Sequence, residues 1–240
     1  MPADHSDATF PITYRFRLED GAEKTFRVEL ERASCALRQP VRASYPEWTR
    51  LDYRQCGHCP LRSETHPHCP VAVGLIDVVA FFRDVRSVEK AEVSVETEER
   101  VTHRGLTPIY PALSSLIGIH MVTSGCPVMD KLRPMARFHL PFATAEETVY
   151  RALSMYALAQ LLRRRRGLPV EEDFSGLARI YQDVNRVNGD FSRRLTSEAL
   201  GEATANAITN LDCFAQMIDF SISEAMFEDL ESVFAGYLGD

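Results

Sequence analysis

Residues 56–70, CGHCPLRSETHPHCP, concentrate cysteine and histidine more densely than any other part of this chain. Cys56 and Cys59 are separated by two residues, the spacing of a metal-binding knuckle, and Cys69 follows soon after them. Cys126 lies far along the chain, yet folding could return it to the same place. Four thiolates suit a tetrahedral structural Zn²⁺ site, so we predict that these four cysteines bind zinc. One thiolate could be replaced by any of three histidines in the segment: His58, His66 or His68.

Proline follows three of these four cysteines, at Cys59-Pro60, Cys69-Pro70 and Cys126-Pro127. Proline is favoured at the first position of a helix, because its missing N–H would be unpaired there and its φ is already helical. The pattern therefore predicts each of the three cysteines at a helix N-cap. There the free backbone N–H groups and the helix dipole should lower the pKa of the thiol and favour the thiolate.

Three other uses of the cysteines stay open from the residues alone. An iron–sulfur cluster takes the same ligands. Thiol redox chemistry could use Cys56 and Cys59 as an attacking and a resolving pair, although no thioredoxin-like βαβ pattern surrounds them. The third use is a loop of buried, inert cysteines. Cys35 and Cys213 lack the pattern, and we expect Cys213 to be a small buried hydrophobic residue.

Two histidines outside this segment have apolar neighbours. His139 lies in the stretch RFHLPF, and His120 lies on the apolar stripe of a predicted helix. Either could line a pocket as a ligand or general base, but the simpler expectation is a core histidine that makes one hydrogen bond. Asn188 occupies an otherwise apolar seam and needs a hydrogen-bond partner or a ligand. Asp77 lies in an apolar predicted helix and also needs a partner. Two arginines are the candidates: Arg104 and Arg137.

The strongest run of charge is Arg163, Arg164, Arg165 and Arg166. Cations are favoured at the carboxyl end of a helix, where they offset the negative end of the dipole. The run therefore predicts a solvated helix end. The alternative is a surface that binds an acidic or anionic partner.

Length and composition predict a cytoplasmic protein that folds without disulfides. A chain of 240 residues with 45% hydrophobic residues can bury a large core. The net charge of −7 argues against nucleic acid as the main partner. We find no amino-terminal signal pattern, and the longest apolar stretch, Val71–Phe82, is too short to span a bilayer. In the cytoplasm the thiols would stay reduced.

The first 140 residues alternate between strand and helix patterns. Apolar residues recur at every second position from Ile12 to Leu18 and from Phe26 to Leu30, which predicts a β-hairpin closed by residues 19–22. A similar alternation over 91–97 predicts a further strand. Between these strands, residues 70–82 are apolar nearly all round and predict a buried helix. Residues 111–123 predict another helix, which Gly125 ends.

From Thr144 onward the pattern is helical. Thr144 and Glu147 form a capping box that begins a helix, and Arg163–Arg166 with Gly167 end it. Apolar residues at three- and four-residue steps then run from Phe174 to Leu195 and predict a long helix with one packed seam. Two further stripes follow, over 208–222 and 227–238.

These elements predict an α+β fold that is predominantly α, with a small antiparallel sheet and Cys-rich loops packed on a carboxyl-terminal helical bundle. We expect one domain over 1–240, in which 10–140 carries the hairpin and metal-binding loop and 144–240 the bundle. The leading function is a metal-binding protein with a structural zinc site. An iron–sulfur or thiol-redox protein and a helical interaction module are the alternatives. The motifs of common enzyme classes, such as a Gly-rich phosphate loop, HExxH or GxSxG, are absent from the sequence, so whether the chain is an enzyme stays open.

Three short motifs, CxHCPL at 56–61, SGCP at 124–127 and FHLPF at 138–142, resemble those of a family of uncharacterised bacterial proteins. The resemblance covers most of the chain and implies no known activity. It implies that the three motifs belong to one site.

Overall fold

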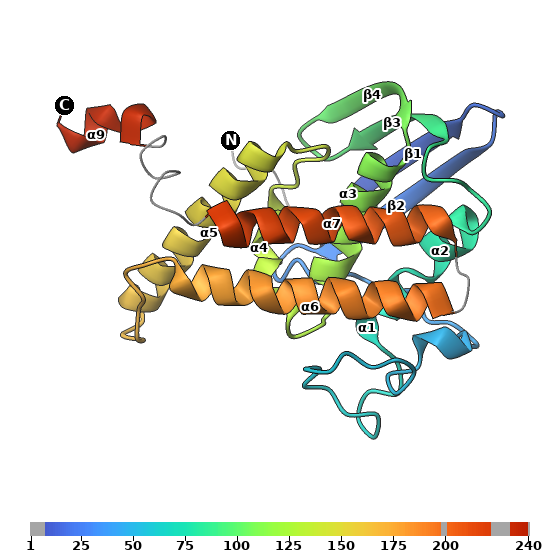
Figure 1. Ribbon diagram of the computed structural model, residues 1–240, viewed down its shortest axis with the longest axis horizontal. Coiled ribbons are helices and arrows are strands. Elements are labelled where there is room, and N and C mark those ends of the chain that lie inside the picture. The colour runs from blue at the N-terminus through green and yellow to red at the C-terminus, as the bar shows by residue number, and fades with distance from the viewer. Residues whose placement is uncertain (1–7, 198–200, 222–230, 240) are drawn as a thin grey trace.

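The computed structural model describes residues 8–197, 201–221 and 231–239. One antiparallel sheet of four strands, in the order β2-β1-β3-β4, lies against helices, and helices make up most of the rest of the fold (Figure 1). The α+β prediction with predominant helix is therefore confirmed. The strands are β1 (Thr9–Leu18), β2 (Glu23–Glu31), β3 (Lys90–Glu96) and β4 (Val101–Pro108).

The predicted hairpin is formed by β1 and β2. Ile12 pairs with Val28 and Tyr14 with Phe26, and these side chains are buried on the face that packs on the helices. The opposite face is wet, as the alternation predicts, because Arg15 and Arg17 lie there and pair with glutamates of β3. The chain reverses at Gly21, whose φ of +87° suits a residue without a Cβ.

Strand β4 was not predicted from the sequence. It pairs with β3 along one side only and forms an edge of the sheet. Its residues are exposed on both faces for most of its length, so they show no apolar alternation. Backbone hydrogen bonds hold an edge strand of this kind in place, and they do not require a particular pattern of residue types.

The predicted helix over 70–82 is two helices, so that prediction was wrong in its continuity. Helix α1 (Pro70–Gly74) ends at Leu75, whose ψ of 3° leaves the helical range, and α2 (Ile76–Phe82) follows at once. Gly74 lies at the break, and a Cβ there would approach the Leu37 side chain at 3.3 Å. A side chain at this position would push the Leu37 side chain aside by a few tenths of an ångström, so glycine suits the close approach, and glycine also weakens the helix at this point.

Three later helices follow the predicted pattern closely. Helix α3 ends before Gly125, which has a φ of +92°. The capping box is present, because Glu147 N–H donates to Thr144 Oγ1 (3.1 Å) and Thr144 N–H to the Glu147 carboxylate (2.7 Å). The seam of α6 is buried from Leu177 to Leu195. The bounds of the remaining elements are η1 (Glu47–Thr49), α3 (Tyr110–Thr123), η2 (Met129–Leu132), α4 (Pro134–Arg137), α5 (Ala145–Arg165), α6 (Ser175–Ser197), α7 (Glu202–Ser221) and α9 (Ala235–Leu238).

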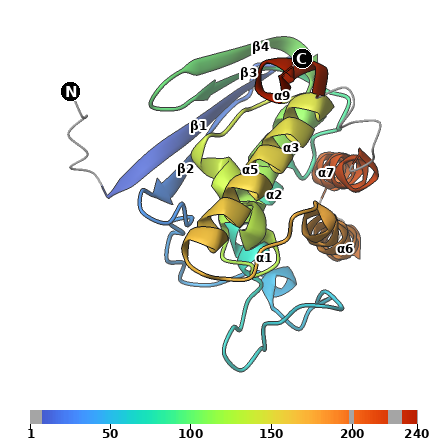
Figure 2. The same ribbon diagram turned by 90° about the vertical axis from the view of Figure 1, so that its left-hand side faces the viewer.

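The helices are arranged in layers on one face of the sheet. Helix α3 lies between the sheet and α7, and α6 and α7 run side by side (Figures 1 and 2). Buried residues form one cluster that extends from the sheet into the bundle. The division into domains is not tested by this arrangement, and one domain over 1–240 stays a prediction.

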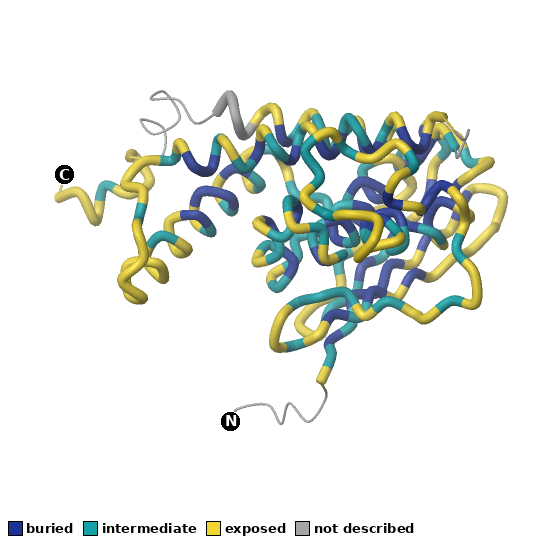
Figure 3. The backbone as a smooth tube through the Cα atoms, turned by 90° about the horizontal axis from the view of Figure 1, so that it is seen from below, coloured by how far each residue is buried: buried dark blue, intermediate teal, exposed yellow. Residues whose placement is uncertain are grey.

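The carboxyl-terminal stripe predicted over 227–238 is not a packed seam where the structure describes it. Phe227 and Leu230 lie outside the described residues, as does Ile222 of the preceding stripe. Phe234 and Leu238 are 38% and 56% exposed, and α9 lies apart from the rest of the molecule (Figures 1 and 3). Within the described ranges, every helix is too short or too polar to cross a membrane.

Candidate functional site

The four predicted zinc ligands come from three separate segments. Cys56 and Cys59 lie in the loop after η1, Cys69 lies immediately before α1, and Cys126 lies between α3 and η2. The fold brings these segments together, because the Cys56 thiol interacts electrostatically with the other three thiols and with Asp190 of α6. Cys126 thus lies within electrostatic range of Cys56.

Helix α6 holds the Cys56–Cys59 turn in place. The Cys59 N–H donates to the Cys56 carbonyl at 3.0 Å and closes the turn. At its tip the Gly57 N–H donates to Asp190 Oδ2 at 3.0 Å, and His58 Nε2 lies 3.2 Å from the Asp183 carbonyl. Both partners lie on α6, so the cysteine loop is fixed to the bundle by polar contacts.

A buried arginine organises the start of the same loop. Arg194 of α6 is only 1% exposed, and its guanidinium donates to the carbonyls of Trp48 (2.9 Å) and Arg50 (2.7 Å). Its positive charge also favours the thiolate of Cys69. Sequence reasoning missed Arg194, although its position three residues after Phe191 places it beside the apolar seam.

The N-cap prediction holds for only part of the set. Cys69 is the N-cap of α1, and Cys126 precedes the turn that leads into η2, but no helix follows Cys59. Backbone N–H groups near the sulfurs of Cys69 and Cys126 do favour the thiolates, without forming a capping hydrogen bond at Cys69. Burial outweighs them and raises the pKa of both thiols.

Burial also raises the pKa of the Cys56 thiol, to about 12, and the neighbouring thiols and Asp190 add to the shift. The predicted lowering of the thiol pKa was wrong for Cys69 and Cys126, because loss of solvation disfavours a thiolate more than the nearby N–H dipoles favour it. A redox reaction that starts from a low-pKa thiolate at Cys56 is disfavoured on the same ground.

The sulfurs do not surround one point as metal ligands do. Within the described ranges, no group of three or more Cys, His, Asp or Glu side chains is arranged to hold a metal ion. The three histidines named as substitute ligands have other partners. His58 contacts the Asp183 carbonyl, His68 Nδ1 lies 2.9 Å from Thr49 Oγ1, and His66 Nδ1 lies 3.0 Å from Thr65 Oγ1.

The other two cysteines lie away from this group. Cys35 is partly buried beside Arg133 and Arg137, and its backbone has a φ of +55°. Cys213 is exposed on α7, so the prediction that it is a buried hydrophobic residue was wrong. Its neighbours Leu211 and Phe214 turn toward the bundle, whereas Cys213 falls on the opposite side of the helix.

His139 lies in a hydrogen-bonded group that joins the sheet to α3. Its Nε2 forms a hydrogen bond of 2.5 Å with the hydroxyl of Tyr14, and the Tyr14 oxygen lies 2.8 Å from Ser115 Oγ. Ser115 Oγ is also 3.5 Å from Nε2. Burial, together with the nearby Arg151 charge, lowers the pKa of His139 to about 3, so the imidazole is neutral near pH 7. His139 thus has a hydrogen-bond partner, as the simpler expectation requires, and that partner is a tyrosine hydroxyl.

His120 packs against α1 instead of lining a pocket. Its Nδ1 is buried 3.7 Å from the position a Cβ on Gly74 would take, and it has no hydrogen-bond partner among the described residues. Burial lowers the pKa of His120 to about 4, and Asp77 opposes this shift. Asp77 itself pairs with Arg42 at 2.6 Å. The candidate partners Arg104 and Arg137 were therefore wrong.

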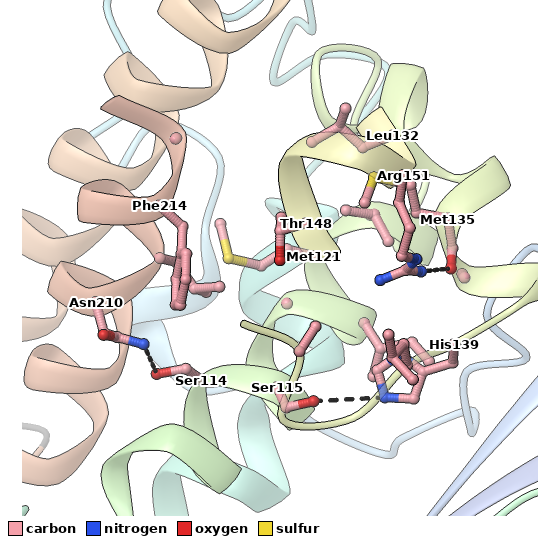
Figure 4. Close-up of a pocket in the computed structure, with 18 of the residues that line it drawn as sticks. Ser114, Ser115, Met121, Leu132, Met135, His139, Thr148, Arg151, Asn210 and Phe214 are labelled. Carbon is pink, nitrogen blue, oxygen red and sulfur yellow. Dashed lines mark hydrogen bonds between the residues drawn. The ribbon is translucent and has the colours of Figure 1, made fainter. Parts of the chain in front are cut away.

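A pocket of about 430 Å³ lies among the helices, beside His139 (Figure 4). Its walls are mostly apolar side chains from α3, η2, α4, α6 and α7. Its polar lining includes Arg151 of α5, Tyr181 and Asn188 of α6, and Asn210 of α7. Sequence reasoning named His139 and Asn188 but missed Arg151 and Tyr181, because nothing in a single helix pattern shows which side chains from different helices will meet.

The arginine run at the end of α5 is exposed throughout. Arg163 Nε donates to the Pro169 carbonyl at 2.7 Å and closes the end of the helix. Among the described residues, none of the four arginines forms an ion pair closer than 4 Å. The run thus caps the helix and also leaves a cationic surface open.

Comparison with known proteins supplies a family. No curated protein and no solved structure matches the chain. A family model described as "Domain of unknown function (DUF6901)" matches residues 12–235, which include the cysteine loop, the pocket and most of the helical bundle. The chain belongs to this family of domains of unknown function.

Proposed function

We propose that the protein binds zinc at Cys56, Cys59, Cys69 and Cys126, and that the ion has a structural role. The observation that carries the proposal is the convergence of these cysteines, from three segments as far apart as residues 56 and 126, to within electrostatic range of one another. A four-thiolate site fills the coordination sphere of Zn²⁺ and leaves no position for a substrate. The ion would fasten the loop 56–69 to α1 and the segment after α3.

The charge around the cysteines supports this proposal. A Zn²⁺ ion with four thiolates carries two negative charges, and a buried cation nearby would offset them. Arg194 is such a cation, because it is almost fully buried and forms no ion pair within the described ranges. A buried unpaired charge is costly, so an anionic metal centre beside it would stabilise the fold.

Zinc binding also requires movement of the sulfurs. Zinc–sulfur bonds are about 2.3 Å long, and no three of the described ligands are placed that closely around one point. A cysteine sulfur moves by rotation about a single bond, χ1, and Cys56 and Cys59 lie in a loop without regular structure. The backbone sets the convergence of the segments, whereas rotation about χ1 sets the direction of each sulfur.

The first experiment measures metal by mass spectrometry together with a visible spectrum, on untagged protein purified without oxygen. We expect one zinc per chain and no colour. Cys126→Ser should lose the metal, while the matched control Cys213→Ser, at an exposed cysteine outside the group, should retain it. Metal-free wild-type protein would refute the proposal. Iron with sulfide and a brown sample would assign the same ligands to an iron–sulfur cluster.

The structural role has its own test. A site worth about 3 kcal/mol would shift the melting temperature of a chain of this size by roughly 6–12 °C. We therefore expect a strong chelator to lower the melting temperature of wild-type protein and to leave that of Cys126→Ser unchanged. Equal melting of loaded and stripped protein would show that any bound metal is not structural.

We also propose that the protein works in the cytoplasm and that the CxHCPL and SGCP motifs form one site. All six cysteines are free, as expected where thiols are kept reduced. Cys59 and Cys126 lie in these two motifs, and their thiols are both close to Cys56. The FHLPF motif contributes His139 to the separate pocket instead.

A further inference from the structure

The pocket beside His139 has a charge opposite to that of the whole chain. The protein carries a net charge of −7. Yet the residues that line the pocket include Arg104 and Arg151 and no aspartate or glutamate. A cavity lined by one sign of charge and walled by apolar side chains attracts the opposite charge strongly, because little solvent screens it. The lining therefore favours an anion.

Arg151 is the cation inside this pocket. One of its terminal nitrogens, Nη2, donates to the carbonyls of Met135 (2.9 Å) and Phe138 (3.0 Å). Figure 4 shows the other end of the guanidinium turned toward the middle of the cavity, on the side of Met121. Burial lowers the pKa of Arg151, and no carboxylate of the described residues pairs with it. Glu147, one turn earlier on α5, opposes the pKa shift, but it forms no ion pair with the guanidinium, so the charge stays open to an anion in the pocket.

Two further polar groups in the lining are poorly satisfied. The hydroxyl of Tyr181 is buried and donates only to the Met135 sulfur at 3.8 Å, which is a weak bond. Tyr181 and Arg151 interact electrostatically and both contact Met135, so their donors lie near each other. Asn188 is 2% exposed, and its Oδ1 has no partner among the described residues. Unpaired buried polar groups are costly unless a ligand meets them.

The apolar part of the lining indicates the size and polarity of the ligand that the pocket can hold. Apolar side chains form most of the wall, and the larger ones include Met121, Met129, Leu132, Leu140 and Phe214. The volume of about 430 Å³ lies in the range of small-molecule sites, about 300–1,000 Å³. Flexible methionines adapt to the shape of an apolar ligand.

We propose that this pocket binds a small carboxylic acid with an apolar body, whose carboxylate accepts hydrogen bonds from Arg151 and Tyr181. Guanidinium and hydroxyl donors suit a carboxylate, and charge-assisted hydrogen bonds in a dry site are strong. His139 nearby is neutral and adds no charge to those of Arg104 and Arg151. The proposal uses none of the cysteines and does not depend on the zinc site.

The test uses isothermal titration calorimetry with three linear fatty acids, octanoate, decanoate and dodecanoate, and with 1-decanol as the uncharged probe. At least one acid should bind wild-type protein with one site per chain. Arg151→Met keeps the apolar stem and removes the charge, so it should weaken the binding of that acid tenfold or more and leave 1-decanol binding little changed. The matched control is Arg186→Met, at an exposed arginine of α6, which should bind the acid like wild type.

A second variant keeps the test decisive if Arg151→Met fails to fold. Gly118 lines the pocket, and a Cβ there would lie 3.4 Å from a flexible leucine side chain. Gly118→Leu should therefore fill part of the cavity and weaken both the acid and 1-decanol. Failure of every acid to bind wild-type protein, or equal binding of the acid to wild type and a folded Arg151→Met or Gly118→Leu, would overturn the proposal.

Discussion

Acid should destabilise this protein through His139, and the size of the effect follows from its surroundings. The pKa of the imidazole is about 3 in the folded chain, against an ordinary value of 6.5. Below pH 6.5 the unfolded state therefore binds a proton that the folded state refuses. The resulting stability is fully present above pH 6.5 and is lost as the pH falls toward 3. A fall from pH 7 to pH 5 should cost about 2 kcal/mol from this residue.

The assay is urea unfolding at pH 7 and pH 5, on wild-type protein and on His139→Gln. Glutamine retains an acceptor for the Tyr14 hydroxyl but does not titrate, so the variant should lose about 2 kcal/mol less than wild type between the two pH values. His66→Gln, at an exposed histidine, is the control and should behave as wild type. His120, with a pKa of about 4, adds a similar loss that both proteins share.

Equal losses in wild type and His139→Gln would refute the reasoning. They would mean that folding does not exclude a proton from this imidazole, and hence that it is not enclosed beside Tyr14 and Ser115. The comparison uses the difference between two proteins, so the titration of other groups cancels.

Three further outcomes follow from single contacts. Arg194→Met should lower the free energy of unfolding in urea by about 3 kcal/mol, because it leaves buried carbonyls of the segment 48–54 without their hydrogen-bond donor. A loss below about 1 kcal/mol would contradict this expectation. Thr144→Ala should cost about 1 kcal/mol in the same assay through loss of the capping box, whereas exposed Thr196→Ala should cost less. Replacement of Arg163–Arg166 by glutamate should abolish retention on a polyanion column at low salt; unchanged retention would remove this surface as an anion-binding site.

Features set by neighbouring residues could be read from the sequence. The hairpin, the capping box at Thr144, the end of α3 at Gly125 and the seam of α6 depend on side chains within a turn or two of one another. The physical causes are local. Side chains alternate between the two faces of a pleated strand, the Thr144 hydroxyl lies near free N–H groups at the start of its helix, and Gly125 adopts the positive φ that ends α3. The grouping of the four cysteines as one metal site stays a prediction.

Other features depended on contacts between distant segments and needed the structure. Strand β4 is defined by its pairing with β3, and the Leu37 side chain that lies against Gly74 comes from a distant segment. The solvation of the cysteines also depends on the tertiary structure, because burial raises the pKa of Cys69 and Cys126 where the local pattern predicted a lower value.

By itself, the sequence determined where the hairpin and most of the helices form, because those properties reside in side-chain type and short-range spacing. Only the tertiary structure decided which groups meet. Arg194 lies beside the cysteine loop, and Arg151, Tyr181 and His139 share one pocket, although they come from α5, α6 and the segment before α5. The packing of apolar seams sets these distances, and a seam specifies that a helix will be buried without specifying its neighbours.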